Sequence, residues 1–288
     1  KLIPARIING DILDYENLTK QMAGHDAVIH TAGVYRFGPL NVKEMHDVNV
    51  KGTENVMLAA VKVKVAKVVY CGSTITKGDT TKAKTLTHED SPRISPIESE
   101  YENSKTLAHQ KVENFIKQGA PISIVMPSHV YGPDDPHGLG QIIKQYVNGN
   151  IHIGLQAPYR ASMVHVQDVA RGVVDALEKG RTGQSYILSG EEAGWENFLF
   201  LLENYSGVTK PSLNIGLKAA KLLGYAADLV SKITRRQGKI SVESVNQLKR
   251  NLIFSNQKAQ VELGWTPRLF SQGFKETVEA YKKGVTRA

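Results

Sequence analysis

Short apolar runs alternate with longer helical stretches through the first 130 residues, and this alternation is the strongest constraint on the fold. Residues 27–31, 67–71 and 122–126 are strand-length runs that are rich in β-branched side chains. Residues 43–60 and 100–118 lie between these runs and show the apolar spacing of a helix. Strands that alternate with helices of this length predict a parallel sheet covered by helices, and therefore an α/β fold.

A tyrosine and a lysine stand four residues apart near the start of the second helix. Tyr101 and Lys105 would share one helical face, and an ammonium close to a phenol favours the phenolate. Tyr101 would then exchange a proton near neutral pH, far below its usual pKa of about 10. Ser73 ends the preceding strand-like run and would hydrogen-bond the same substrate oxygen. A solvated helix charge is the alternative reading of Lys105.

Six further segments occur in the order typical of one enzyme family. The chain from Asn9 to Thr266 resembles the extended short-chain dehydrogenase/reductases of the NAD-dependent epimerase/dehydratase type. The resemblance implies a Rossmann-type doubly wound parallel sheet with a smaller C-terminal substrate lobe. Residues 1–132 would form the dinucleotide-binding domain, and 133–288 mainly the substrate-binding lobe, with some elements returning to the sheet. The six segments are 10–12, 27–33, 49–56, 127–133, 164–170 and 256–267.

The resemblance also implies roles for individual residues. Tyr101 would be the general acid/base, Lys105 would lower its pKa and bind the nicotinamide ribose, and Ser73 would hold the reacting oxygen. Asn49 would lie on the cofactor side, with helix capping as its alternative role. The residues expected to bind cofactor are Asp11, Ile12, Thr31, Ala32, Gly33, Asn49, Tyr101, Lys105, Pro127 and Ser128. The residues expected to face substrate are Tyr35, Thr74, His129 and Tyr131, with Thr74 as the substitute for Ser73.

The glycine-rich fingerprint of this family, Gly-x-x-Gly-x-x-Gly after the first strand, is absent from the residues before Gly33. Residues 1–11 predict the approach to and exit from the family's third strand. The first strand–helix–strand unit, which carries the pyrophosphate-binding helix N-terminus, would then precede Lys1 and add on the order of 40 residues. Without that unit, we expect an open side, or another chain, beside the strand at 27–31.

Two segments place the chain within the family. Residues 30–35 and 126–133 look closest to the dihydroflavonol reductase and 3β-hydroxysteroid dehydrogenase-like branch. This resemblance implies an NAD(P)-dependent oxidoreductase that interconverts a ketone and a secondary alcohol on a small, fairly apolar substrate. NAD and NADP both stay open, with NADP slightly favoured. One alternative is a nucleotide-sugar epimerase that uses the same three catalytic residues, and another is a non-catalytic NAD(P)-sensing or scaffold protein.

The net charge of +8 is unevenly distributed, with nine basic residues against two acidic ones between 209 and 250. An acidic ligand, an anionic membrane and nucleic acid would each explain this excess, but a solvated helical face is the favoured reading. No nucleic-acid motif accompanies the charge, so the expected partner is a small-molecule substrate and not a nucleic acid. Residues 215–233 mix apolar side chains with lysines, which keeps peripheral membrane contact open beside a lid or plain core. A homodimer also stays open.

The remaining composition favours a cytoplasmic protein without a metal site. Cys71 is the single cysteine, so no intrachain disulfide can form, which suits a reducing compartment. His30, His129 and His165 have spacings that fit no compact metal-ligand pattern, and no metal is expected.

Overall fold

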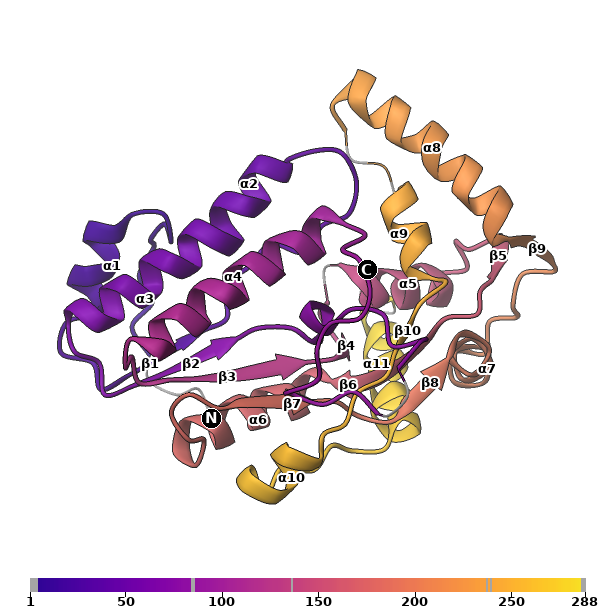
Figure 1. The fold of residues 1–288 in the computed structure, drawn as a ribbon. Helices are drawn as coiled ribbons and strands as arrows, with labels where there is room; N and C mark the ends of the chain where they lie inside the picture. Colours follow the sequence, from indigo (N-terminus) through magenta and orange to yellow (C-terminus); the bar gives the residue numbers. More distant parts are fainter. Residues whose placement is uncertain (1–4, 84–85, 136, 237, 239, 286–288) are drawn as a thin grey trace.

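The computed structural model describes residues 5–83, 86–135, 137–236, 238 and 240–285. Its centre is a four-stranded sheet in which every neighbouring pair of strands is parallel. This sheet confirms the predicted α/β, Rossmann-type fold class (Figure 1). In spatial order the strands are β1 (Ala27–His30), β2 (Lys67–Cys71), β3 (Ile122–Pro127) and β7 (Ser185–Leu188).

Helices cover both faces of this sheet, as Figure 1 shows. One face carries α3 (Thr53–Lys62) and α4 (Glu100–Lys117), and α1 (Tyr15–Met22) packs against α3. The opposite face carries α6 (Val166–Glu178), whose apolar side meets β2 and β3. The predicted helix at 43–60 is continuous but irregular, because α2 (Val42–His46) runs into α3 through a π-helical turn at Asp47–Gly52.

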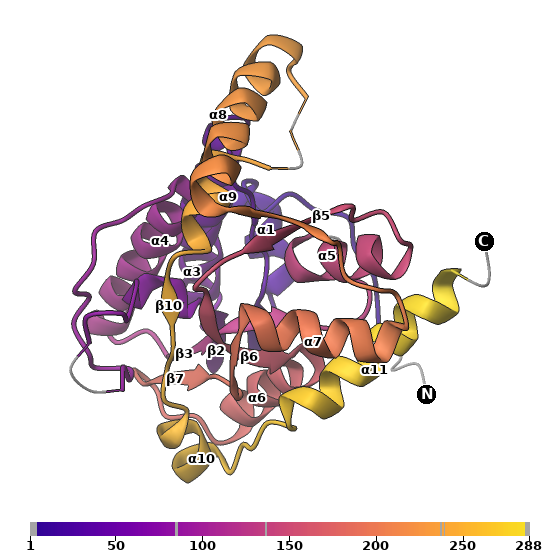
Figure 2. The same cartoon turned by 90° about the vertical axis from the view of Figure 1, so that its right-hand side faces the viewer.

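A second sheet lies beyond the carboxyl ends of these strands. Its parallel strands β10 (Asn251–Leu252), β6 (Arg160–His165) and β4 (His129–Tyr131) are joined by β8 (Glu192–Gly194), which runs antiparallel to β6. Three mutually packed helices accompany this sheet, as the turned view in Figure 2 shows. They are α5 (Gly138–Val147), α7 (Trp195–Ser206) and α11 (Phe270–Val285).

The remaining elements form the edge of this half. A short parallel pair joins β5 (Ile153–Gln156) to β9 (Leu213–Gly216), and β9 leads directly into α8 (Leu217–Thr234). Helix α8 contacts α9 (Val242–Gln247), β9 and β5, and its far end extends away from the rest of the molecule in both views (Figures 1 and 2). Helix α10 (Gln257–Leu263) packs near β7 and α6. No helix in the described ranges is long and apolar enough to cross a membrane.

The strand β1 is an edge strand. Within the described residues it pairs with β2 on one side only, which agrees with the predicted open side beside 27–31. The strand expected around Ile7 and Ile8 does not form, so that prediction is wrong for residues 5–11. These residues have no regular structure, and Ile7 is 92% exposed. An extended segment that pairs with no neighbouring strand has no ladder to stabilise it.

The segment at 164–170 has a structural role through its buried Asp168. Asp168, at the start of α6, is 1% exposed and accepts hydrogen bonds from the backbone and side chain of Arg268, each at 3.0 Å. The Asp168 carbonyl also accepts a bond of 2.8 Å from the Trp265 indole. These contacts join α6 to the late segment at 256–267.

Candidate active site

The carboxyl ends of β1, β2 and β3 open into a cavity of about 520 Å³. Its walls come from the segment after β1, the 3-10 turn η2 (Thr74–Lys77) after β2, the first turns of α4, and residues 127–135 after β3. Ligands of open α/β sheets bind at this end of the strands, where the loops gather and helix N-termini point inward.

The three predicted catalytic residues all border this cavity. Tyr101 lies in the first turn of α4, where the Ser99 hydroxyl caps the helix by accepting a bond of 3.2 Å from the Glu102 amide. Lys105 follows one turn later on the same face. Ser73 caps the 3-10 turn at the end of β2, where its hydroxyl accepts a bond from the Ile75 amide.

The Lys105 ammonium is buried without a carboxylate partner among the described residues. The side chain is 9% exposed, and its Nζ lies 3.4 Å from the Cys71 carbonyl oxygen and 5.5 Å from the centre of the Tyr70 ring. An ammonium has three donors, so a buried one whose hydrogen bond in the described residues goes to a single carbonyl keeps donor capacity for a ligand hydroxyl. Lys105 is therefore not the solvated helix charge of the alternative reading.

The net shift of the Tyr101 pKa differs from the prediction. Burial raises this pKa above its ordinary value, and the opposing effects of the Lys105 charge and a hydrogen bond with Ser73 lower it only in part. The expectation of a strongly lowered pKa was wrong because helical spacing shows the neighbouring charge but not the desolvation around it. A protonated phenol is the form that can donate to a carbonyl oxygen.

The π-helical turn positions the segment after β1. Asn49 is 2% exposed, and its side chain accepts a bond of 2.7 Å from the Val34 amide and donates to the Val34 carbonyl and to the Ser104 hydroxyl, each at 2.9 Å. These bonds of Asn49 position the segment that carries Tyr35 and Phe37. Both rings pack edge-on against the Tyr101 ring, with 4.9 and 5.8 Å between the ring centres. Asn49 thus positions the cavity wall, while also bordering the cavity itself.

Most of the predicted cofactor residues gather at the cavity, and three do not. Asp11, Ile12 and Ala32 do not border it. The Asp11 carboxylate accepts a bond of 2.8 Å from the Leu13 amide in a local turn. The Ile12 side chain packs so closely against Gly52 that position 52 has no room for a side chain. The predicted residues that border the cavity are Thr31, Gly33, Asn49, Tyr101, Lys105, Pro127 and Ser128.

The cavity wall fits the nicotinamide end of a dinucleotide. The Ser128 hydroxyl is buried and has no hydrogen-bond partner among the described residues, so it can bind a ligand amide or hydroxyl. A Cβ atom on Gly33 would approach the Asn49 side-chain oxygen to 3.3 Å, so glycine lets the backbone run close to the cavity. Together with the Lys105 ammonium, these groups supply hydrogen-bond donors and a close approach of the backbone to a bound ligand.

The predicted substrate residues divide into two groups. Tyr35 and His129 border the cavity, and a hydrogen bond joins the Tyr159 hydroxyl to Nδ1 of His129. Burial lowers the His129 pKa to about 4, so its ring is neutral at pH 7. Thr74 and Tyr131 also border the cavity, but their hydroxyls are turned to backbone carbonyls. Thr74 donates to Pro127 at 3.2 Å and Tyr131 to Phe270 at 3.4 Å.

Thr74 and Tyr131 therefore have structural contacts in addition to their places at the cavity, and their substrate roles stay predictions. Thr74 ties the end of β2 to the end of β3. The Tyr131 ring is 1% exposed and packs among His165, Phe270 and Phe274. Burial beneath α11 could not be read from the local sequence, because α11 begins 139 residues later in the chain at Phe270.

The last residue of α9, Gln247, belongs to the cavity and was not predicted. Gln247 is 8% exposed, and its Oε1 accepts a bond of 2.9 Å from Arg250. Its Nε2 has no hydrogen-bond partner in the part of the chain that the structure describes, although buried amide nitrogens ordinarily have one. Because Gln247 borders the cavity, this nitrogen is a candidate donor to a bound ligand.

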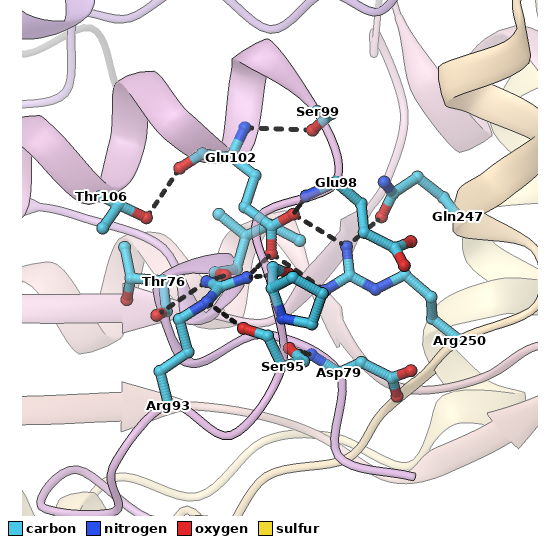
Figure 3. Close-up of polar contacts among 12 residues, drawn as sticks. Thr76, Asp79, Arg93, Ser95, Glu98, Ser99, Glu102, Thr106, Gln247 and Arg250 are labelled. Atoms are coloured by element: carbon cyan, nitrogen blue, oxygen red, sulfur yellow. Dashed lines mark hydrogen bonds and ion pairs between the residues drawn. The ribbon is translucent and has the colours of Figure 1, made fainter.

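A buried ion-pair cluster supports this wall, as Figure 3 shows. Arg250 bonds both carboxylate oxygens of Glu102, and Arg93 reaches the same carboxylate at 2.6 Å. Arg93 also donates to the backbone carbonyls of Ile75 and Thr76 beside the cavity. No local sequence signal marks this cluster, because Arg250 lies 148 residues from Glu102 in the chain.

Helix α9 is also fixed to the opposite rim. One Glu243 oxygen accepts a bond of 2.7 Å from the Gly38 amide, and the other accepts one of 3.1 Å from the Glu100 amide at the start of α4. A single carboxylate therefore joins the segment after β1 and the helix that carries Tyr101.

The chain resembles proteins with several related activities. A protein of Synechocystis sp. with the provisional name dihydroflavonol 4-reductase is 26% identical over 97% of this chain and 82% of its own length. A 4-hydroxy-2-methyl-3-oxo-4-farnesyl-3,4-dihydroquinoline-1-oxide ketoreductase of Stigmatella aurantiaca is 27% identical, over 93% and 80% of the two chains. An N-acetyl-alpha-D-glucosaminyl-diphospho-ditrans,octacis-undecaprenol 4-epimerase of Escherichia coli O157:H7 is 23% identical, over 95% and 84%.

Solved structures show the same fold. The dTDP-glucose 4,6-dehydratase DesIV from Streptomyces venezuelae, solved with NAD bound, superposes with a TM-score of 0.78 at 21% identity, over 96% of this chain and 80% of that one. Residues 1–189 match the sequence profile of the NAD dependent epimerase/dehydratase family. With this match over most of the chain and the geometry of its cavity, the protein is a member of the NAD dependent epimerase/dehydratase family.

Proposed function

We propose that this protein is an NAD(P)-dependent oxidoreductase that interconverts a ketone and a secondary alcohol on a small, fairly apolar substrate. The observation that carries the proposal is the meeting of Ser73, Tyr101 and Lys105 at one cavity. The apolar substrate class is supported by side chains such as Phe37, Leu139 and Leu252 on the other walls of the cavity. The ketoreductase relative, whose name specifies a farnesylated ketone, is in keeping with this class.

The three residues have distinct roles in this proposal. In the direction of reduction, the Tyr101 phenol donates its proton to the carbonyl oxygen, and the Ser73 hydroxyl donates a hydrogen bond to that oxygen. The buried Lys105 ammonium stabilises the phenolate that remains. The nicotinamide, when bound, supplies the hydride for reduction or accepts it in oxidation. Thr31, Gly33, Lys105 and Ser128 would hold the cofactor at this end of the sheet.

The proposal also assigns a preferred direction. Burial keeps the Tyr101 pKa above its ordinary value, so the phenol is protonated at neutral pH. Carbonyl reduction needs that form, whereas alcohol oxidation needs the phenolate. We therefore infer that reduction runs at neutral pH and that oxidation becomes faster as the pH rises.

The test is an assay with both reduced cofactors and two kinds of substrate. The protein is incubated with NADPH or NADH and a panel of apolar ketones, and in parallel with sugar nucleotides. Net loss of nicotinamide absorbance with a ketone, absent in Tyr101→Phe, would support the proposal. Conversion of a sugar nucleotide without that loss would identify an epimerase instead. Cofactor binding without turnover of either substrate would favour the sensing or scaffold role.

A further inference from the structure

Helix α8 exposes a continuous apolar face that the catalytic proposal does not use. Six large apolar side chains along it are between 51% and 75% exposed. The opposite side of the helix, with Ala220, Gly224 and Ser231, is buried. Exposed apolar patches of this kind mark interaction surfaces more often than chance. The six side chains are Leu222, Leu223, Tyr225, Leu229, Val230 and Ile233.

The spacing of these six residues places them on one face of α8. Leu222, Leu229 and Ile233 are separated by seven and four residues, which aligns them along the helix axis. Leu223, Tyr225 and Val230 widen the same stripe to both sides. Because α8 extends away from the rest of the molecule (Figures 1 and 2), this stripe is accessible to a large flat partner.

Basic side chains accompany the stripe. Five basic residues and one acidic residue lie between Leu217 and Arg236. The acidic residue, Asp228, accepts a bond of 3.1 Å from the Val242 amide. The five form no ion pair within the described part of the chain. Lys221 instead lies 5.9 Å from the centre of the Tyr225 ring. The five basic residues are Lys218, Lys221, Lys232, Arg235 and Arg236.

We propose that α8 docks this protein on an anionic membrane surface, with its apolar face inserted at the boundary between headgroups and acyl chains. A helix with an apolar face and lysines beside it binds such interfaces through buried apolar area and attraction to anionic lipids. A second copy of the chain is a poorer occupant. A twofold interface sets the same patch against itself, so these five positive charges would face five others.

The test is flotation of the protein with vesicles of phosphatidylcholine, with or without one third phosphatidylglycerol. We expect the protein to float with the anionic vesicles and to bind the neutral ones much more weakly. The triple variant Leu222→Gln, Leu229→Gln and Ile233→Gln should lose binding to both. Glutamine is a good helix former, so α8 should persist. A matched control replaces three exposed apolar residues outside α8, Phe200→Gln, Val261→Gln and Leu269→Gln, and should bind as the unsubstituted protein does.

A second set of variants tests the charges. Each basic residue near an anionic surface strengthens binding roughly fivefold, so Lys221→Gln, Lys232→Gln and Arg235→Gln together should weaken binding on the order of a hundredfold. Raised salt should weaken binding of the unsubstituted protein in the same direction. The control replaces three exposed lysines elsewhere, Lys20→Gln, Lys51→Gln and Lys275→Gln, and should change binding little.

Several outcomes would overturn this proposal. The unsubstituted protein could fail to bind anionic vesicles, or the α8 and control variants could lose binding equally. A dimer in sedimentation that dissociates in the Leu222, Leu229 and Ile233 variant, without vesicle binding, would assign the face to a second copy. Thermal unfolding and ketone turnover are measured on every variant, so that a loss of fold is recognised. The vesicle result does not depend on the proposed reaction.

Discussion

Glu102 in α4 and Arg250 after α9 form a fully buried bidentate ion pair, although 148 residues separate them in the chain. The two bonds measure 3.1 and 2.9 Å. Glu102 directly follows Tyr101, and Arg250 also holds the side-chain oxygen of Gln247. The pair therefore connects the catalytic helix to the α9 wall of the cavity.

Replacing Glu102 should destabilise the whole fold. Glu102→Gln leaves Arg250 buried without a counter-charge, and the loss of one partner of a buried pair costs about 3–5 kcal/mol in the free energy of unfolding. Urea unfolding at pH 7 measures this value. The control is Glu113→Gln in the same helix, whose half-exposed contact with His109 is expected to contribute below about 1 kcal/mol. Equal losses in the two variants would show that the Glu102 cluster contributes no more than a surface contact.

The Glu102 carboxylate should also make the free energy of unfolding depend on pH. The bonds from Arg250, Glu98 and Arg93 lower the Glu102 pKa despite its burial. A carboxyl whose folded pKa is depressed contributes stability above its unfolded pKa, and this contribution is lost as the pH falls through the folded value. The unsubstituted protein should therefore lose more stability in acid than Glu102→Gln does.

Removing the Tyr101 hydroxyl should abolish most turnover. General acid/base groups contribute roughly 10²–10⁴-fold to the rate, so Tyr101→Phe should lower kcat by that factor while the fold and cofactor binding persist. Steady-state kinetics with a ketone substrate, and cofactor titration, measure the two effects. Tyr225→Phe on α8, which makes the same change away from the cavity, is the control. Activity of Tyr101→Phe within about threefold of the unsubstituted protein would rule out the assigned role.

Removing the Lys105 charge should shift the pH profile. This charge lowers the Tyr101 pKa, so Lys105→Met should raise the pKa seen in the rate of alcohol oxidation and weaken cofactor binding. The profile of oxidation against pH should move to higher pH. Lys111→Met, which removes a more exposed lysine of the same helix that pairs with Glu54, should leave it in place. An unchanged profile in Lys105→Met would argue that the ammonium has no part in the chemistry.

His30 should make the fold sensitive to mild acid. Burial lowers its pKa to about 4, against an ordinary value of 6.5, and its ring bonds the Thr53 hydroxyl at 2.9 Å. In mild acid the unfolded chain binds a proton at His30 that the folded chain excludes. The contribution of His30 to the free energy of unfolding is therefore fully present above pH 6.5 and is lost as the pH falls towards 4. Between pH 7 and 5 this effect is about 2 kcal/mol. His30→Gln should reduce the loss measured by urea unfolding, whereas replacing the exposed His25 should not.

Gln247 should affect substrate binding more than chemistry. Gln247→Glu keeps an oxygen for Arg250 but removes the unpaired Nε2 donor on the cavity wall. We expect the substrate to accept a hydrogen bond from this nitrogen. Loss of one such bond should raise KM roughly tenfold and leave kcat little changed. Gln257→Glu at the exposed start of α10 is the control. A fall in kcat without a change in KM would instead place Gln247 in the chemical step.

The sequence predicted those helices and strands that are marked by a local pattern of apolar residues. The strand at 67–71 has the predicted bounds, and the helix at 100–118 ends within one residue of the prediction. Ser73, Tyr101 and Lys105 were found because strand ends and helical spacing place them on one side of a sheet. These signals act over a few residues, and the hydrophobic periodicity that carries them is strong.

Long-range contacts were beyond the reach of those signals. The burial of the Tyr131 ring depends on α11, and the role of Gln247 depends on an arginine that faces a distant helix. The direction of the Tyr101 pKa shift depends on desolvation by several segments. The strand expected near Ile7 was wrong because strand formation needs a paired neighbour as well as apolar residues.

The two bonds of Glu243 couple parts of the cavity rim that are far apart in the chain. Since one carboxylate accepts from both the Gly38 and Glu100 amides, an exchange of helix α9 should also affect the segment after β1 and the start of α4. A chimaera whose imported α9 has another residue in place of Glu243 would leave two partly buried amides without their acceptor. A change at Glu243 should therefore call for a compensating change near Gly38, 205 residues away in the chain.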